Sequence, residues 1–250
     1  DRKHIERRSA DVSEIFLYNG DGLTSPFSPE WAFWEEEWRN VRPGRTYGDW
    51  TGDLAGRPRT CYTEGCIRSD AFRNYLLNKR NEFFSRAKTP LTPKAINYYF
   101  DTGVGSTFCA NTHHGCSNWL DAYGKPHGRM AIDAYRKVHL DTYRMIRRTG
   151  PAAKIMTHQG WYRVMPMQHF TDVIIGGEGV ENMISSTGSY YSVLTPEMFR
   201  ATFLPQIWGV KTAFLNMLVR ATARSPEKLV RFAEDPEAQR ATRHYYGYCM

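Results

Sequence analysis

The sequence predicts an α/β fold of the (β/α)8 TIM-barrel type, built as an incomplete barrel. Short apolar runs alternate with segments of helical periodicity along the 250 residues, which favours a parallel sheet with helices on its faces. Three successive strands are followed by polar residues, as at the carboxyl edge of a barrel. No Gly-rich phosphate motif follows any strand, so a dinucleotide-binding sheet is not expected. We therefore expect residues 1–250 to form a single catalytic-type barrel domain, truncated at both ends.

Each expected strand is a short apolar run that stops at a turn signal. The runs are rich in β-branched and aromatic residues, which pack well on a pleated sheet. They cover residues 14–19, 96–100, 154–157 and 170–175. Because a closed barrel has eight strands, these four strands leave the predicted barrel incomplete.

The expected helices begin at caps or show helical periodicity. Ser28–Pro29 and Thr195–Pro196 each place an N-cap hydroxyl before a proline at the first helical position. The helices that we expect cover residues 28–38, 70–87, 129–148, 195–203 and 206–223, and the tail 224–250 is expected to hold one helix or to be partly ordered. Residues 40–66, rich in glycine and proline, are expected to form a long loop.

The composition is that of an ordinary globular chain with an excess of aromatic residues. Aromatics make up 14% of the chain, a level that often lines carbohydrate clefts but that also fills cores. The formal charge is +7, but the basic residues are scattered beside acidic ones and no nucleic-acid motif is present. No apolar run approaches the roughly 20 residues of a membrane span. We therefore expect neither a nucleic-acid nor a membrane partner.

The cysteines leave two alternatives open. The chain has five, namely Cys61, Cys66, Cys109, Cys116 and Cys249. Cys61 and Cys66 are close enough in sequence to form a disulfide, and so are Cys109 and Cys116. Zinc is the other alternative, because His113 and His114 lie between Cys109 and Cys116 in one loop. The spacing matches no standard zinc motif, so we expect no metal and no cofactor.

Polar residues at three expected strand ends point to acid–base chemistry. Asp101 ends one strand, His158–Gln159 end the next, and Glu178 follows the third among glycines. In a barrel these residues would meet on one face. Two carboxylates from different strands are what glycosidic cleavage needs. We assign Asp101 as nucleophile or transition-state stabiliser and Glu178 as general acid/base of a glycoside hydrolase acting on a poly- or oligosaccharide.

Other side chains are candidates for contacts with the sugar. Aromatic rings pack on sugar faces, and imidazole, amide and guanidinium groups hydrogen-bond hydroxyls. The candidates are His114, His158, Gln159, Trp161, His113, Asn111, Trp119, Arg129 and Tyr191. For each histidine, a structural hydrogen bond is the competing interpretation.

Four segments resemble a known family. They are YYFDTG at 98–103, CANTHHGC at 109–116, THQG at 157–160 and FTDVIIGGEG at 170–179. Together they resemble the bacterial glycoside-hydrolase-like TIM barrels related to glycoside hydrolase family 123, over roughly residues 14–220. The resemblance implies a barrel with a sugar-binding face, a periplasmic or extracellular location, and accessory β-domains in the full-length parent.

The family's mechanism does not carry over completely. Family 123 enzymes are similar to substrate-assisted hexosaminidases, which use neighbouring Asp and Glu residues. Here Thr102 follows Asp101, so that adjacent pair is absent and N-acetylhexosamine specificity is not implied. Two other functions stay open. One is a non-catalytic carbohydrate-binding barrel, and the other is a metal-dependent hydrolase that uses the Cys/His loop.

Overall fold

The computed structural model describes most of the expected elements. The described residues are 14–20, 22–41, 50–52, 60–87, 96–101, 108–116, 119–127, 129–158, 169–177, 195–203 and 209–215, with single or paired positions at 193 and between 236 and 247. Within these ranges no helix is both long enough and apolar enough to span a bilayer.

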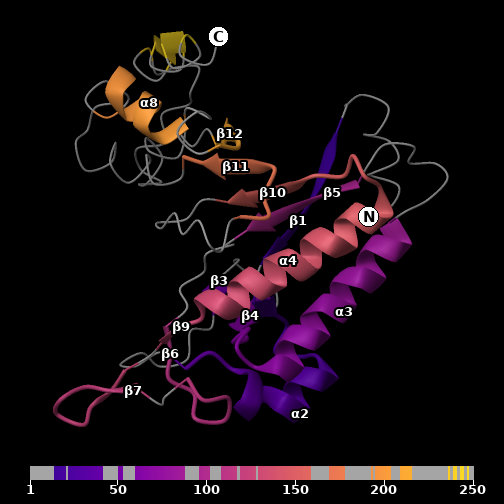
Figure 1. The fold of residues 1–250 in the computed structure, drawn as a ribbon, viewed down its shortest axis with the longest axis vertical. Coiled ribbons are helices and arrows are strands. Elements are labelled where there is room, and N and C mark those ends of the chain that lie inside the picture. Colours follow the sequence, from indigo (N-terminus) through magenta and orange to yellow (C-terminus); the bar gives the residue numbers. More distant parts are fainter. Residues whose placement is uncertain are drawn as a thin grey trace.

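A parallel sheet of five strands forms the centre of the fold (Figure 1). Its strands are β1 (Ile15–Gly20), β5 (Ile96–Asp101), β10 (Ile155–His158), β11 (Val173–Gly176) and β12 (Lys211–Phe214), and they lie side by side in that order. All neighbouring pairs are parallel. An order that follows the chain without reversal is the pattern of a (β/α)8 barrel, whereas a doubly wound sheet reverses at a switch point. The predicted α/β fold is confirmed, with these strands in the order of an incomplete barrel.

Helices α3 (Asp70–Ala87) and α4 (Ile132–Thr149) lie side by side against one face of the sheet (Figure 1). Tyr98 and Phe100 of β5 point to this face and are almost fully buried. They pack with Phe84 of α3 and Ile146 of α4 in one apolar cluster. Each fully buried aromatic or aliphatic side chain contributes about 1.5–3 kcal/mol. Alternate residues of β5 therefore fix which face of the sheet the helices cover.

A second apolar cluster joins α3 and α4 to helix α2 (Pro29–Trp38). The hydroxyl of Ser28 accepts the Trp31 backbone N–H at 3.2 Å, with Pro29 in the first turn, as the sequence predicts. Trp31 and Trp38 are buried and pack around Phe72 of α3. This cluster holds α2, which lies in the connection between β1 and β5, against α3 and α4.

Short antiparallel strands lie in the connections between these elements. They are β2 (Leu23–Thr24), β3 (Trp50–Gly52), β4 (Thr60–Glu64), β6 (Phe108–Cys109), β7 (Trp119–Leu120), β8 (Pro126–His127) and β9 (Arg129–Met130). They form a three-stranded sheet, β2-β4-β3, and two two-stranded ribbons, β6-β9 and β7-β8. The prediction of an uninterrupted loop over residues 40–66 was wrong, because β3 and β4 pair there. The glycine and proline residues lie largely between these strands, and their high content in the segment led to the prediction of a loop.

The prediction of a helix from residue 206 to 223 was also wrong where the structure describes that segment. Lys211–Phe214 is strand β12, which pairs with β11 through Val173↔Lys211 to Gly176↔Phe214. Four residues are too few to separate helical from strand periodicity, so pairing with a neighbouring strand decides. Helix α8 (Pro196–Phe203) precedes β12, and the Thr195 hydroxyl accepts the Met198 backbone N–H, as expected for an N-cap.

Candidate functional site

Three strand ends converge at the carboxyl edge of the central sheet. Gly20 of β1 lies opposite Asp101 of β5 in the parallel register. Thr157 of β10 lies opposite Phe100, so His158 comes level with Asp101. In β/α barrels this edge carries the catalytic groups, because strands from distant parts of the sequence end there together.

The side chains at this edge lie on the sheet face opposite α3 and α4. Tyr98 and Phe100 take the helix face of β5, so the alternate residues Tyr99 and Asp101 point the other way. Tyr18 of β1 is paired with Tyr99 in the register, and the two rings meet edge to face at 5.3 Å between centroids. In a barrel, the face away from the helices is the interior. This edge therefore has the position of a barrel active site.

Asp101 accepts hydrogen bonds from both neighbouring strands. The ring Nδ1–H of His158 donates to Asp101 Oδ1 at 2.7 Å. The phenol of Tyr18 donates to the other oxygen, Oδ2. Donors on both oxygens stabilise the ionised carboxylate and fix its orientation. We call Tyr18, Asp101 and His158 the Asp101 cluster.

The Asp101 cluster is open to a ligand on one side. The side chain of His158 is 7% exposed and that of Asp101 is 17% exposed. Tyr18 is 62% exposed. A carboxylate that is held by a buried imidazole, yet still reaches solvent, can meet a substrate. The sequence pointed to Asp101 and His158, but it did not identify Tyr18 as their partner.

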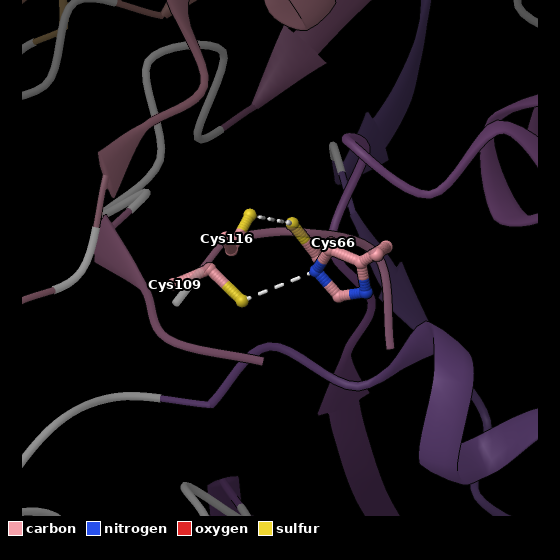
Figure 2. Close-up of side chains that lie close together, drawn as sticks. Cys66, Cys109 and Cys116 are labelled. Atoms are coloured by element: carbon pink, nitrogen blue, oxygen red, sulfur yellow. Dashed lines mark hydrogen bonds between the residues drawn. The ribbon is translucent and has the colours of Figure 1, made fainter. Parts of the chain in front are cut away.

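A second group of side chains gathers away from the strand ends. Cys66, Cys109, His114 and Cys116 bring four potential metal-binding atoms within 4.8 Å of one another. Cys66 lies between β4 and α3, and the other three belong to the segment 108–116. Figure 2 shows the three cysteine sulfurs turned toward a common point. We call these four residues the Cys/His cluster.

The three cysteines of the Cys/His cluster form no disulfide in the structure. Cys66 Sγ and Cys116 Sγ lie 3.9 Å apart, far beyond the S–S bond of about 2.05 Å (Figure 2). Cys109 Sγ lies 3.3 Å from His114 Nε2. All three cysteines carry free thiols. The predicted alternative of a Cys109–Cys116 bridge is therefore not what the structure holds, and the side chain of Cys61 lies outside the described part of the chain.

Hydrogen bonds within the Cys/His cluster favour a thiolate at Cys109. Thiol donors from Cys116 and Cys66, with a further bond from His114, hold the pKa of Cys109 well below its usual range. Bonds with the neighbouring thiols raise the pKa of Cys66. Burial lowers the pKa of His114, but its bonds to Cys109 and Cys116 outweigh burial and raise it to about 10. The cluster thus places a Cys109 thiolate beside a protonated His114 imidazole in a largely buried position.

Asn111 holds the segment 108–116 onto the end of α2. Its side-chain amide donates to the carbonyl oxygens of Glu36 at 2.8 Å and Arg39 at 3.0 Å. Its carbonyl oxygen accepts the backbone N–H of His113 at 2.8 Å. With 3% of its surface exposed, Asn111 is placed as a structural hydrogen-bonding group. The side chain of His113 is exposed, and no bond of its ring is described.

The structure brings together only part of the predicted site. Asp101 and His158 meet directly, whereas His114 and Asn111 belong to the Cys/His cluster and its support. Trp119 and Arg129 are described through their backbone alone, in β7 and β9. Gln159, Trp161, Glu178 and Tyr191 lie outside the described residues. The long-range partner Cys66 was missed, because no local spacing connects it to a loop beginning 42 residues later, at Phe108.

Comparisons with known proteins give no family. No family model matches this chain, and no curated protein matches it. Among solved structures, the chain is similar to the crystal structure of an α-amylase from Geobacillus thermoleovorans complexed with acarbose, with a TM-score of 0.44 and 8% sequence identity. The match covers 100% of this chain and 60% of that chain. The α/β assignment therefore rests on the strand order and the helix layer described above.

Proposed function

We propose that the chain is a glycoside hydrolase whose reaction centre is the Asp101 cluster. The observation that carries this proposal is the position of Asp101 at the carboxyl end of a central parallel strand, with a donor from each neighbouring strand. That position is typical of a catalytic side chain in a β/α barrel, because the side chain faces away from the helix layer and its apolar core. The carbohydrate substrate class is supported by the family resemblance of the strand-end motifs.

Asp101 fits the role of nucleophile or electrostatic stabiliser. Cleavage of a glycosidic bond passes through a positively charged, oxocarbenium-like transition state, which a nearby carboxylate stabilises. Because Tyr18 and His158 both donate to Asp101, the charged form is favoured and the oxygens are fixed in position. A general acid would need the protonated form instead, and these two donors oppose it.

Glu178 is our candidate for the general acid/base. It follows β11 by two residues, and β11 is separated from β5 by β10 alone. Neighbouring strands lie about 4.8 Å apart, so two spacings separate these strand ends by roughly 10 Å. Carboxyl pairs in glycosidases are about 5–5.5 Å apart in retaining enzymes and about 6.5–9.5 Å apart in inverting ones. The two carboxyl groups would come within either range if the side chains of Asp101 and Glu178 lean toward each other.

The remaining sugar contacts stay predictions. A sugar bound over Asp101 would extend along the carboxyl edge, where the segments after β10 and β11 begin. Gln159 and Trp161 follow β10, and Tyr191 follows β11. We propose these three as groups that bind hydroxyls and a ring face.

The test compares two carboxylate variants on aryl glycosides that differ in their leaving groups. The purified chain is first assayed on a panel of α- and β-linked 4-nitrophenyl glycosides, and on a polysaccharide that it cleaves. We expect Asp101→Asn to lose about 10³-fold in kcat/KM on every cleaved substrate, or about 4 kcal/mol of transition-state stabilisation. We expect Glu178→Ala to lose about 10²–10⁴-fold on poor leaving groups and far less on dinitrophenyl glycosides, which need no acid.

Controls distinguish a failed proposal from a damaged protein. Circular dichroism and thermal unfolding establish that both variants are folded. Glu181→Gln, three residues after Glu178, controls for the loss of a carboxylate in the same segment. If the parent binds the polysaccharide but cleaves no glycoside, the non-catalytic carbohydrate-binding function replaces this one. If folded Asp101→Asn keeps the parent rate, Asp101 has no part in the reaction.

A further inference from the structure

We propose that Cys66, Cys109, His114 and Cys116 bind one structural Zn²⁺ ion. All four potential ligand atoms lie within 4.8 Å of one another, although Cys66 and Cys116 are 50 positions apart in sequence. Buried thiols gathered in this way are what a soft, tetrahedral metal centre requires. This differs from the sequence expectation of no metal.

The distances fit a single tetrahedral ion. With Zn–S bonds of about 2.3 Å, a tetrahedral angle puts two sulfur ligands about 3.8 Å apart, and a sulfur and an imidazole nitrogen about 3.5 Å apart. The Cys66–Cys116 sulfur separation is 3.9 Å and the Cys109 Sγ–His114 Nε2 distance is 3.3 Å. An iron–sulfur cluster places bridging sulfides between its irons and holds its cysteines farther apart. The spacing therefore favours one ion.

Backbone groups orient the ligands toward this ion. The Glu37 carbonyl lies 2.6 Å from His114 Nδ1. A carbonyl oxygen only accepts, so Nδ1 carries a hydrogen and Nε2 faces the thiols. The backbone N–H of Asn111 donates to Cys109 Sγ at 3.4 Å, which stabilises a thiolate. Such outer contacts are typical of metal sites, where they fix the imidazole tautomer and tune the sulfur ligands.

The cluster is a closed site rather than a reaction centre. Four protein ligands complete the tetrahedral coordination of zinc, whereas catalytic zinc keeps one position for water or substrate. Cys109 and Cys116 are completely buried and Cys66 nearly so. This argues against the metal-dependent hydrolase considered from the sequence, because a substrate would have to displace a ligand. We assign the ion a structural role.

The ion would join two segments that are distant in sequence and that both contact the end of α2. Cys66 precedes α3, and its backbone N–H donates to the Trp38 carbonyl at 2.6 Å. His114 reaches the Glu37 carbonyl in the last turn of α2. Cys109 and Cys116 bracket the turn between them. Cross-linking segments that are distant in sequence removes loop-closure entropy from the unfolded chain, so the ion stabilises the folded connection between β5 and α4.

Metal analysis of the full chain tests this proposal. Purified under reducing conditions without chelator, the chain should contain one Zn²⁺ by plasma mass spectrometry. Replacement by Co²⁺ should give sulfur-to-cobalt charge-transfer bands in the near ultraviolet and strong visible bands of tetrahedral Co²⁺. His114→Ala should lose both the stoichiometric metal and this spectrum. His113→Ala is the matched control, because His113 is the adjacent exposed histidine and should retain both.

A second variant decides the matter if His114→Ala does not fold. His114→Cys supplies a fourth thiolate in place of the imidazole, so it should retain one metal ion, and its charge-transfer absorption should increase. Substoichiometric metal in the parent, a Cys66–Cys116 disulfide found by mass spectrometry of the freshly purified chain, or an unchanged cobalt spectrum in His114→Cys would each overturn the proposal. None of these readouts depends on glycosidase activity.

Discussion

The Asp101 cluster and the Cys/His cluster differ in how their ionisable side chains are hydrogen-bonded and exposed. Asp101 already has a hydrogen-bond donor on each oxygen, and it still reaches solvent. In the Cys/His cluster the three thiols are almost fully buried, two of them lie 3.9 Å apart, and Cys109 also contacts the His114 ring and the Asn111 backbone N–H. The first arrangement stabilises a single negative charge near a surface, while the second gathers four potential metal ligands in a buried position.

The elements that build each cluster explain this difference. Strand ends of one sheet position the Asp101 cluster, so its geometry follows from the register of β1, β5 and β10. The Cys/His cluster is assembled from the turn before α3 and the segment 108–116, which belong to different small β-structures rather than to the central sheet. We therefore expect damage to the first cluster to affect reaction rate, and damage to the second to affect stability.

The largest expected effect is on the stability of the metal site. Cys116→Ala removes a ligand and leaves the other thiols buried without their ion. Structural zinc supplies about 10–16 kcal/mol in small peptides, so we expect a loss of at least about 4 kcal/mol in the free energy of unfolding. For a chain of this size that corresponds to a fall of about 10 °C in Tm. Differential scanning calorimetry in a zinc-containing buffer measures it.

Two controls show whether the two clusters are independent. Asp101→Asn should change the free energy of unfolding by only about 1 kcal/mol, because an amide keeps one of the two hydrogen bonds. Cys249→Ala, a thiol remote in sequence, should leave the Tm unchanged. Equal destabilisation by Cys116→Ala and Asp101→Asn would contradict the division between a stability site and a reaction site.

The sequence predicted an element correctly where a local pattern is typical of a single kind of secondary structure. The alternation around Asp101, the Ser28–Pro29 cap and the amphipathic helix 70–87 each predicted an element that the structure contains. Asp101 and His158 were placed correctly at strand ends, because parallel strands carry their carboxyl ends to one edge. Strand β12 was misassigned, because four residues carry too little periodicity.

The fourth member of the Cys/His cluster, Cys66, could not be predicted from the sequence. Cys109, His114 and Cys116 lie in one loop, and a metal was considered there, but His113 stood in the place that Cys66 takes. Cys66 comes close because β4 and α3 deliver it beside α2, a tertiary relationship with no local signal. The same holds for Tyr18, whose contact with Asp101 depends on β1 pairing with β5.

A smaller expected effect concerns Asn111, which sequence reasoning assigned to the sugar and the structure assigns to the support of the Cys/His cluster. Asn111→Ala leaves the carbonyls of Glu36 and Arg39 without this buried donor. We expect a loss of about 2–3 kcal/mol in the free energy of unfolding and an unchanged kcat/KM. Thr112→Ala, an exposed neighbour, is the matched control. A Tm like that of the parent combined with a raised KM would instead place Asn111 at the sugar.

The smallest effect tests how His158 acts within the Asp101 cluster. Its Nδ1–H donates to Asp101, so it is a positioning residue for the carboxylate. A hydrogen bond to a charged group contributes about 1.5–3 kcal/mol, so His158→Ala should lower kcat about 10–100-fold with little change in KM. His158→Asn places an amide N–H where Nδ1 lies and should recover most of this loss, whereas His169→Ala, an exposed histidine, should have no effect. If His158→Asn is as impaired as His158→Ala, orientation of Asp101 is not the role of the imidazole, and proton transfer through the ring would have to replace it.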